Sequence, residues 1–169
     1  MLNYNQVTNS EINNNGVSIK EIAPIMKLNL RGKTREFFTN VGKSLNMILP
    51  TEANTSSSSD KLTAIWLSPD EWMIVSNEKV SIDTNQYELN DILFNNISKT
   101  SLGAVTDVTD QFVQLELKGG KIYELFSSGS PFNFNEFKEK KGSTTQTVLN
   151  HIDIVLQHKD ENIVNLFVR

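Results

Sequence analysis

The residues of this sequence that could transfer protons are two carboxylate pairs, Asp70-Glu71 and Asp107 with Asp110. Acid–base catalysis requires both groups of a pair to reach one substrate. Asp107 and Asp110 stand three residues apart, so they would face opposite sides of a continuous strand. Around a turn, the same side chains would instead cap backbone amides. Turn capping and a pocket that binds a heterocycle therefore both stay open for Asp107 and Asp110.

The other pair stands in AIWLSPDEWMIV (64–75), between the only two tryptophans of the chain, Trp66 and Trp72. Apolar runs flank a Ser-Pro-Asp-Glu segment, and proline suits the second position of a type I turn because its φ angle is already fixed. The stretch predicts two strands joined by a tight turn. Asp70 and Glu71 then belong to the tip of a β-hairpin, which favours a turn role over catalysis.

The remaining chemistry is sparse. His151 and His158 fall on one predicted strand, seven residues apart, so they point to opposite faces and do not suit a shared metal. The chain has no cysteine, which excludes disulfides, thiolate nucleophiles and cysteine-ligated zinc. It also contains no Rossmann, Walker or G-x-S-x-G motif. We therefore expect no catalytic, cofactor-binding or metal-binding residue in this chain.

The composition indicates a soluble globular protein of 169 residues with a formal net charge of -4. Nucleic-acid binding needs a concentrated basic footprint, and the sequence has no basic block. No apolar run approaches the roughly 18 residues that span a bilayer, and the N-terminus lacks the basic flank and apolar core of a signal peptide. We expect a cytoplasmic protein that binds neither nucleic acid nor membrane.

Hydrophobic periodicity predicts the elements that position these residues. Gly42 is expected to weaken or end the first helix. The expected order is a strand (23–32), a helix (33–50), a polar loop (51–60), a hairpin (61–76), a helix (86–99), a pair of strands (103–108 and 111–119), a short helix (120–129), a loop (130–143) and a final strand pair (145–158 and 162–169).

Two segments allow two interpretations each. Residues 1–22 form a polar, Asn-rich arm, which is either a disordered tail or an extended segment that orders along a partner. The loop PFNFNEF carries Phe132, Phe134 and Phe137, which either fill the core or contact another chain. Trp66 and Trp72 would stabilise either a core or an interface by burial. The candidate partner contacts are therefore Trp66, Trp72, Phe132 and Phe134.

An internal repeat indicates how the elements combine. Leu28, Leu30 and Gly32 recur 87 positions later as Leu115, Leu117 and Gly119, and Asp70-Glu71 recurs 90 positions later as Asp160-Glu161. One half has too little apolar area to be stable alone. The prediction is an α+β fold of two pseudo-symmetric β-α-β-β halves, about 23–99 and 103–169, within a single domain over 23–169.

A series of motifs extends from about residue 18 to the C-terminus. The sequence resembles the gamma subunit of heterotetrameric sarcosine oxidase through this series of motifs, of which WLSPDEWMIV (66–75) and AVTDVTDQ (104–111) are the most specific. The motifs are LRG (30–32), WLSPDEWMIV (66–75), AVTDVTDQ (104–111), LKGGK (117–121), SGSPFN (128–133) and TVLNHIDIVL (147–156), together with LP (49–50) and Asn54.

This resemblance implies a fold similar to the folate-binding domain of the glycine-cleavage T-protein. It also implies assembly with alpha, beta and delta subunits, mainly with alpha. In such a complex, FAD, FMN, NAD, tetrahydrofolate and the zinc of the delta subunit belong to the other chains. The complex demethylates sarcosine oxidatively to glycine, with tetrahydrofolate accepting the one-carbon unit. The gamma chain is expected to be a noncatalytic subunit.

The sequence departs from the family pattern at two places. That pattern usually continues past Arg169 with Ser-Phe-Ala and a closing helix, and it usually has an aspartate followed by leucine where this chain has Asn133 and Phe134. The alternative function is a free-standing folate-binding or aminomethyltransferase-like protein that uses Asp107 or Asp110 on the pterin. Enzymes of that kind carry further domains after this module, which favours the subunit interpretation.

Overall fold

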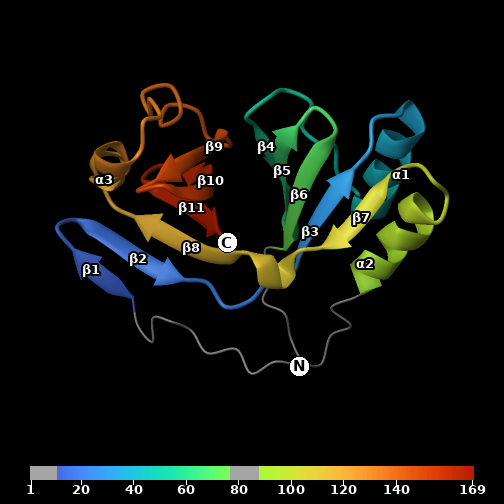
Figure 1. Cartoon of the computed structure of the whole chain (residues 1–169), viewed down its shortest axis with the longest axis horizontal. Coiled ribbons are helices and arrows are strands. Elements are labelled where there is room, and N and C mark those ends of the chain that lie inside the picture. Colours follow the sequence, from blue (N-terminus) through green and yellow to red (C-terminus); the bar gives the residue numbers. More distant parts are fainter. Residues whose placement is uncertain (1–10, 77–87) are drawn as a thin grey trace. The chain divides into compact units, whose positions relative to one another are not determined.

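The computed structural model describes residues 11–76 and 88–169, which fold into two units (Figure 1). The middle unit is Ile25–Thr109, and the terminal unit combines the segment up to Pro24 with Asp110–Arg169. Each unit has one antiparallel sheet and helical segments, so the mixture of helices and strands expected for the predicted α+β fold is confirmed. Residues 1–10 of the predicted arm and the start of the predicted 86–99 helix lie outside the described residues.

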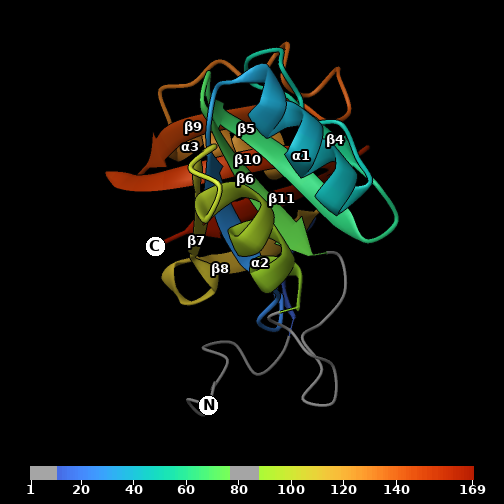
Figure 2. The same cartoon turned by 90° about the vertical axis from the view of Figure 1, so that its right-hand side faces the viewer.

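The middle unit contains a five-stranded sheet of order β4-β5-β6-β3-β7, whose paired strands are all antiparallel. Figure 2 shows α1 and α2 side by side in front of this sheet. Its elements are β3 (Lys27–Arg31), α1 (Arg35–Leu45), β4 (Ser56–Ser58), β5 (Leu62–Ser68), β6 (Glu71–Ser76), α2 (Glu88–Leu93), the π-helical turn η1 (Phe94–Ser98) and β7 (Ala104–Asp107).

The sequence of α1 explains both ends of the helix. Thr34 is the N-cap, and its hydroxyl accepts a hydrogen bond from the Phe37 backbone N–H at 3.1 Å. Asn46 ends the helix with a φ of 50°, a conformation that asparagine tolerates well. Gly42 was expected to weaken or end the helix; the helix continues through it to Leu45, so the alternative that it ends the helix was wrong. Tertiary packing outweighs the roughly 1 kcal/mol propensity cost of glycine.

The terminal unit contains a six-stranded sheet of order β1-β2-β8-β11-β10-β9. Helix α3 packs against it through Ile122 and Phe126. The elements are β1 (Ile12–Asn14), β2 (Val17–Glu21), β8 (Val113–Lys118), α3 (Ile122–Gly129), β9 (Thr144–Leu149), β10 (Ile152–Asp160) and β11 (Ile163–Val168). The 3-10 turn η2 (Thr109–Gln111) follows β7 in the chain and begins at the last residue of the middle unit.

Four expectations about strands need correction. The disordered-tail interpretation fails for Ile12–Glu21, which forms the β1–β2 hairpin, and the polar loop 51–60 contains β4. β7 and β8 do not pair with each other, because β7 pairs with β3, and β8 with β2 and β11. The predicted strand 145–158 is two strands, β9 and β10, joined at Asn150 and His151, which both have positive φ.

The two sheets repeat one order of elements. β3, α1, β4, β5 and β6 follow one another in the chain, and β4, β5, β6 and β3 are successive neighbours in the sheet. β8, α3, β9, β10 and β11 repeat this order, with β9, β10, β11 and β8 as successive neighbours. The next neighbour is then β7 beside β3 and β2 beside β8. In the chain, β7 is the last strand before β8, and β2 is the last strand before β3, so each repeat is joined by the strand that directly precedes the other repeat.

Candidate functional site: partner-binding surfaces

The acidic pair Asp70-Glu71 lies at the tip of the β5–β6 hairpin, as the sequence predicts. The Ser68 hydroxyl donates to Asp70 Oδ1 at 2.8 Å, and Arg31 Nη2 lies 3.2 Å from Asp70 Oδ2. The Ser68 hydrogen bond, together with the Arg31 guanidinium, holds the pKa of Asp70 below its usual range. Asn29 donates to Glu71 Oε1 at 2.7 Å. Both carboxylates therefore join this hairpin to β3, which is a structural role.

In the second pair, Asp107 and Asp110, the carboxylate of Asp107 also has a structural role. Asp107 Oδ1 accepts the Thr109 backbone N–H at 2.9 Å. The Thr109 hydroxyl in turn accepts the Lys27 backbone N–H at 3.0 Å, which fixes the end of β7 beside the start of β3. Asp107 and Asp110 are both exposed. Turn capping therefore describes Asp107, and neither carboxyl group has the burial that a closed ligand pocket gives its lining.

The two tryptophans are cross-strand partners with different environments. Trp72 on β6 is 1% exposed, and its indole N–H donates to the Pro50 carbonyl at 2.8 Å. Its ring centroid lies 5.9 Å from that of Phe37 and 5.3 Å from that of Phe38. Trp66 on β5 is opposite Trp72 and only partly buried. Of the two, Trp66 alone keeps surface for another chain, and Trp72 belongs to the core of the middle unit.

The aromatic loop fills the core of the terminal unit. Phe134 and Phe137 are each 4% exposed, whereas Phe132 is half-buried. The Phe134 ring stacks on Phe126 of α3 at 5.5 Å and meets Phe132 edge-on at 5.0 Å. Burial next to these rings raises the pKa of Tyr123 to about 12. Phe134, offered from sequence as a partner contact, is thus a core residue, and Phe132 keeps the exposed surface.

The two histidines do not meet. His158 on β10 is 4% exposed, and its Nδ1 lies 3.1 Å from the Phe137 carbonyl and 3.0 Å from the Lys140 carbonyl. Because both neighbours are acceptors, Nδ1 carries the proton and ties the aromatic loop to the sheet. His151 lies in the β9–β10 turn rather than on the strand where it was predicted. No cluster of metal-ligating side chains occurs in residues 11–76 and 88–169.

An ionic cluster that no sequence motif indicates surrounds Glu116 on β8. The ammonium groups of Lys118 and Lys159 each lie 2.8 Å from a carboxylate oxygen of Glu116, whose side chain is 11% exposed. Burial by itself would raise the pKa of Glu116, but the hydrogen bonds from both lysines outweigh it. They lower the pKa below its usual value of 4.5. The Lys159–Glu116 ion pair thereby connects β10 to β8 across the intervening strand β11.

We expect Glu116→Gln to destabilise the chain by about 1 kcal/mol or less at neutral pH, since both lysines are half exposed. A depressed pKa means that the carboxylate contributes fully above pH 4.5 and loses its contribution as the pH falls through the lower folded-state pKa. Urea unfolding of wild type and variant at about pH 7 and about pH 3 measures this. An equal difference in stability at both pH values would contradict the prediction.

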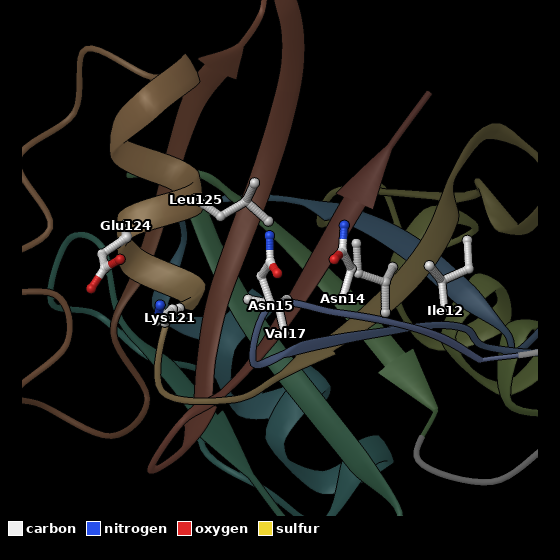
Figure 3. Close-up of a pocket in the computed structure, with 8 residues that line it drawn as sticks. Ile12, Asn14, Asn15, Val17, Lys121, Glu124 and Leu125 are labelled. Atoms are coloured by element: carbon white, nitrogen blue, oxygen red, sulfur yellow. The ribbon is translucent and has the colours of Figure 1, made fainter.

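Several large apolar side chains remain exposed on the described part of the chain. Two of them, Ile12 of β1 and Leu125 of α3, line one groove of the terminal unit with a volume of about 430 Å³ (Figure 3). Because Ile12 and Leu125 line the same groove, they mark a candidate partner contact, whereas single exposed apolar side chains are ordinary on protein surfaces. The exposed large apolar side chains of the described residues are Ile12, Ile48, Ile92, Phe94, Val113, Leu125 and Ile152.

Comparison with known proteins decides the family. A family model described as "Sarcosine oxidase, gamma subunit family" matches residues 32–169. The chain belongs to this family. Among curated proteins, none matches the chain.

A solved structure supports the fold of this gamma-subunit-family chain. It is "Heterotetrameric Sarcosine Oxidase from Corynebacterium sp. U-96 in complex with pyrrole 2-carboxylate". The match has a TM-score of 0.79 and 19% identity, and covers 90% of this chain and 75% of that chain. At this identity the likeness concerns the fold. None of the described helices is long and apolar enough to cross a bilayer.

The sequence offered residues 1–22 as an arm that orders along a partner, but it did not predict that Ile12–Glu21 forms the β1–β2 hairpin. The exposed Leu125 of α3 was absent from the predicted contacts. One signal was available in the sequence. Asn15-Gly16 is a strong indicator of a two-residue hairpin turn, and both residues have the positive φ that this turn requires.

Proposed function

We propose that this chain is the noncatalytic gamma subunit of a heterotetrameric sarcosine oxidase. The observation that carries the proposal is the gamma-subunit family match over residues 32–169. The chain assembles with alpha, beta and delta subunits in the cytoplasm and packs mainly on alpha. The complex demethylates sarcosine oxidatively to glycine, and tetrahydrofolate accepts the one-carbon unit. FAD, FMN, NAD, tetrahydrofolate and zinc are held by the other subunits.

The contacts of the candidate catalytic groups support a noncatalytic role. Asp70 is engaged by Ser68 and Arg31, and Asp107 caps a turn. The imidazole of His158 is buried between two carbonyl groups. A general acid or base must reach a substrate atom directly or through one water molecule. These three side chains instead hold strands and loops of their own units.

The repeated order of elements supports a fold related to the folate-binding domain of the glycine-cleavage T-protein. In that proposal, an ancestral β-α-β-β-β unit was duplicated, and each copy gave one sheet of the present chain. Both copies retain the same sequence of sheet neighbours, with β3 corresponding to β8 and α1 to α3. The partly exposed Trp66 and Phe132 are the aromatic residues that we propose for contact with alpha.

The alternative, a free-standing folate-binding protein, depends on Asp107 or Asp110. Its carboxylate would have to accept hydrogen bonds from the pterin inside a concave site. Asp107 already accepts the Thr109 amide, and Asp110 is exposed on η2. No observation on these residues favours this alternative over the subunit proposal.

Co-expression with tagged alpha, beta and delta subunits tests the proposal. We expect all four chains to co-purify on the alpha tag, and calorimetric titration of the isolated chain with tetrahydrofolate to give no binding heat. Co-purification without the delta and beta genes tests whether alpha alone suffices. Absence of a complex, together with micromolar folate binding that Asp110→Ala abolishes, would replace the subunit proposal with the folate-binding alternative.

A further inference from the structure

An apolar groove runs between the β1–β2 hairpin and helix α3 in the terminal unit (Figure 3). Its floor includes Val17 and Ile19 of β2, which pack against the core of the unit. Its walls are Ile12 of β1, 49% exposed, and Leu125 of α3, 41% exposed. Within the described residues, these two side chains are left facing solvent on opposite sides of an apolar floor.

The repeat shows what fills the corresponding place in the middle unit. There, α1 corresponds to α3, and β7 corresponds to β2 as the strand beside the first strand of the repeat. The α2–η1 segment (88–98) contacts both α1 and β7. Leu93 and Ile97 of this segment are fully buried in the core of the middle unit. A short amphipathic helix therefore closes the gap between helix and edge strand.

The terminal unit has a different element at this point of the repeat. The segment that precedes β7 is the α2–η1 helix, whereas the segment that precedes β2 is strand β1, which extends the sheet edge. The described part of the terminal unit thus contains one helix, α3, where the middle unit has α1 and α2 together. Because α3 corresponds to α1 and β2 to β7 in the order of elements, the groove between α3 and the β1–β2 hairpin corresponds in topology to the place of the second helix.

We propose that this groove receives an amphipathic helix from another subunit of the heterotetramer, in the place that α2–η1 takes in the middle unit. The inference rests on the proposed function, because it assigns the occupant to a subunit of that complex. Helices of this type dock through apolar residues spaced along one face.

The occupant's chemistry follows from the groove and from α2–η1. In that segment Leu89, Leu93 and Ile97 are spaced four residues apart and pack on one core, so the incoming helix should present three aliphatic side chains at the same spacing. Lys121 and Glu124 border the groove on α3. An acidic residue near Lys121 and a basic residue near Glu124 would complement this rim.

Photo-crosslinking inside the assembled complex tests the inference. Leu125→p-benzoylphenylalanine places the reactive group in the groove, and Ile152→p-benzoylphenylalanine is the matched control, 54% exposed but outside the groove. Each variant is co-expressed with alpha, beta and delta, irradiated, and mapped by mass spectrometry. We expect position 125, but not position 152, to crosslink to an amphipathic helical segment of a partner subunit.

A charge variant supplies the second measurement. Leu125→Asp should weaken assembly about tenfold, because docking would bury an unpaired carboxylate, whereas Ile152→Asp should assemble as the wild type does. Leu125 is exposed, so circular dichroism of the isolated variant should match the wild type.

The outcomes separate this inference from the proposed function. Wild-type assembly with crosslinks only within this chain, or only to a second copy, would overturn the helix-docking inference and leave the subunit proposal intact. Full assembly of Leu125→Asp would overturn it as well. Failure of the wild-type chain to assemble with the other subunits would overturn both.

Discussion

Trp72→Ala is expected to lower the free energy of unfolding of the middle unit by about 3–5 kcal/mol. Trp72 is 1% exposed and packs against Phe37 and Phe38, so its removal leaves a cavity in the core of that unit. The substitution also leaves the Pro50 carbonyl without the indole N–H that lies 2.8 Å away. Urea unfolding followed by circular dichroism measures the loss without depending on tryptophan fluorescence.

Trp66→Ala is the matched control for this prediction. Trp66 pairs with Trp72 across the hairpin but keeps exposed surface, so we expect a smaller loss of about 1–2 kcal/mol. Trp72→Phe retains an aromatic ring and removes the indole N–H, so it separates the contribution of the hydrogen bond to stability from most of the contribution of packing. Unchanged stability of Trp72→Ala, combined with loss of subunit assembly, would contradict the core assignment and return Trp72 to the interface.

The local elements could be predicted because their signals lie within a few residues. The apolar runs around Pro69 and Asp70 indicated the β5–β6 hairpin, and helical spacing indicated α1 and α3. The Asn15-Gly16 turn was equally local, yet the polar composition of 1–22 concealed it. Composition describes the average of a segment, whereas a hairpin depends on two residues with positive φ.

Strand pairing was less predictable than the strands themselves. β7 pairs with β3 and β2 pairs with β8, although each pair is separated by more than seventy residues of chain. Local sequence favoured pairing β7 with β8, because neighbouring strands commonly form hairpins. Which strand pairs with which depends on how segments far apart in the chain complete each sheet, and no short sequence pattern encodes that.

Partner-contact residues, like strand pairing, could not be predicted from local sequence. Large aromatic residues were offered as partner contacts, but Trp72 and Phe134 are buried in their own units. Residue type predicts a large burial energy without saying whether the core or a partner provides the burial. Ile12 and Leu125 carried no distinguishing signal, since an exposed isoleucine or leucine becomes informative only when the fold places it beside another.

Gly119→Ala is expected to cost about 3 kcal/mol or more and to detach the β1–β2 hairpin from β8. Gly119 has a φ of 130°, a backbone conformation that only glycine adopts readily. A Cβ at this position would also lie 2.0 Å from the Gly16 carbonyl oxygen in the hairpin turn. Backbone atoms would have to move on both sides of the contact, so the strain cannot be relieved by a side-chain rotation.

Gly120→Ala is a control at the neighbouring residue, where an added Cβ meets nothing within 4 Å. We expect it to change stability by about 0.5 kcal/mol or less. Hydrogen exchange of the β2 amides that face β8 should speed up in Gly119→Ala and stay unchanged in Gly120→Ala. Equal behaviour of the two variants would contradict the close approach of the β1–β2 turn to β8. Because this hairpin forms one wall of the groove that we assign to a partner helix, Gly119→Ala should also weaken crosslinking from position 125.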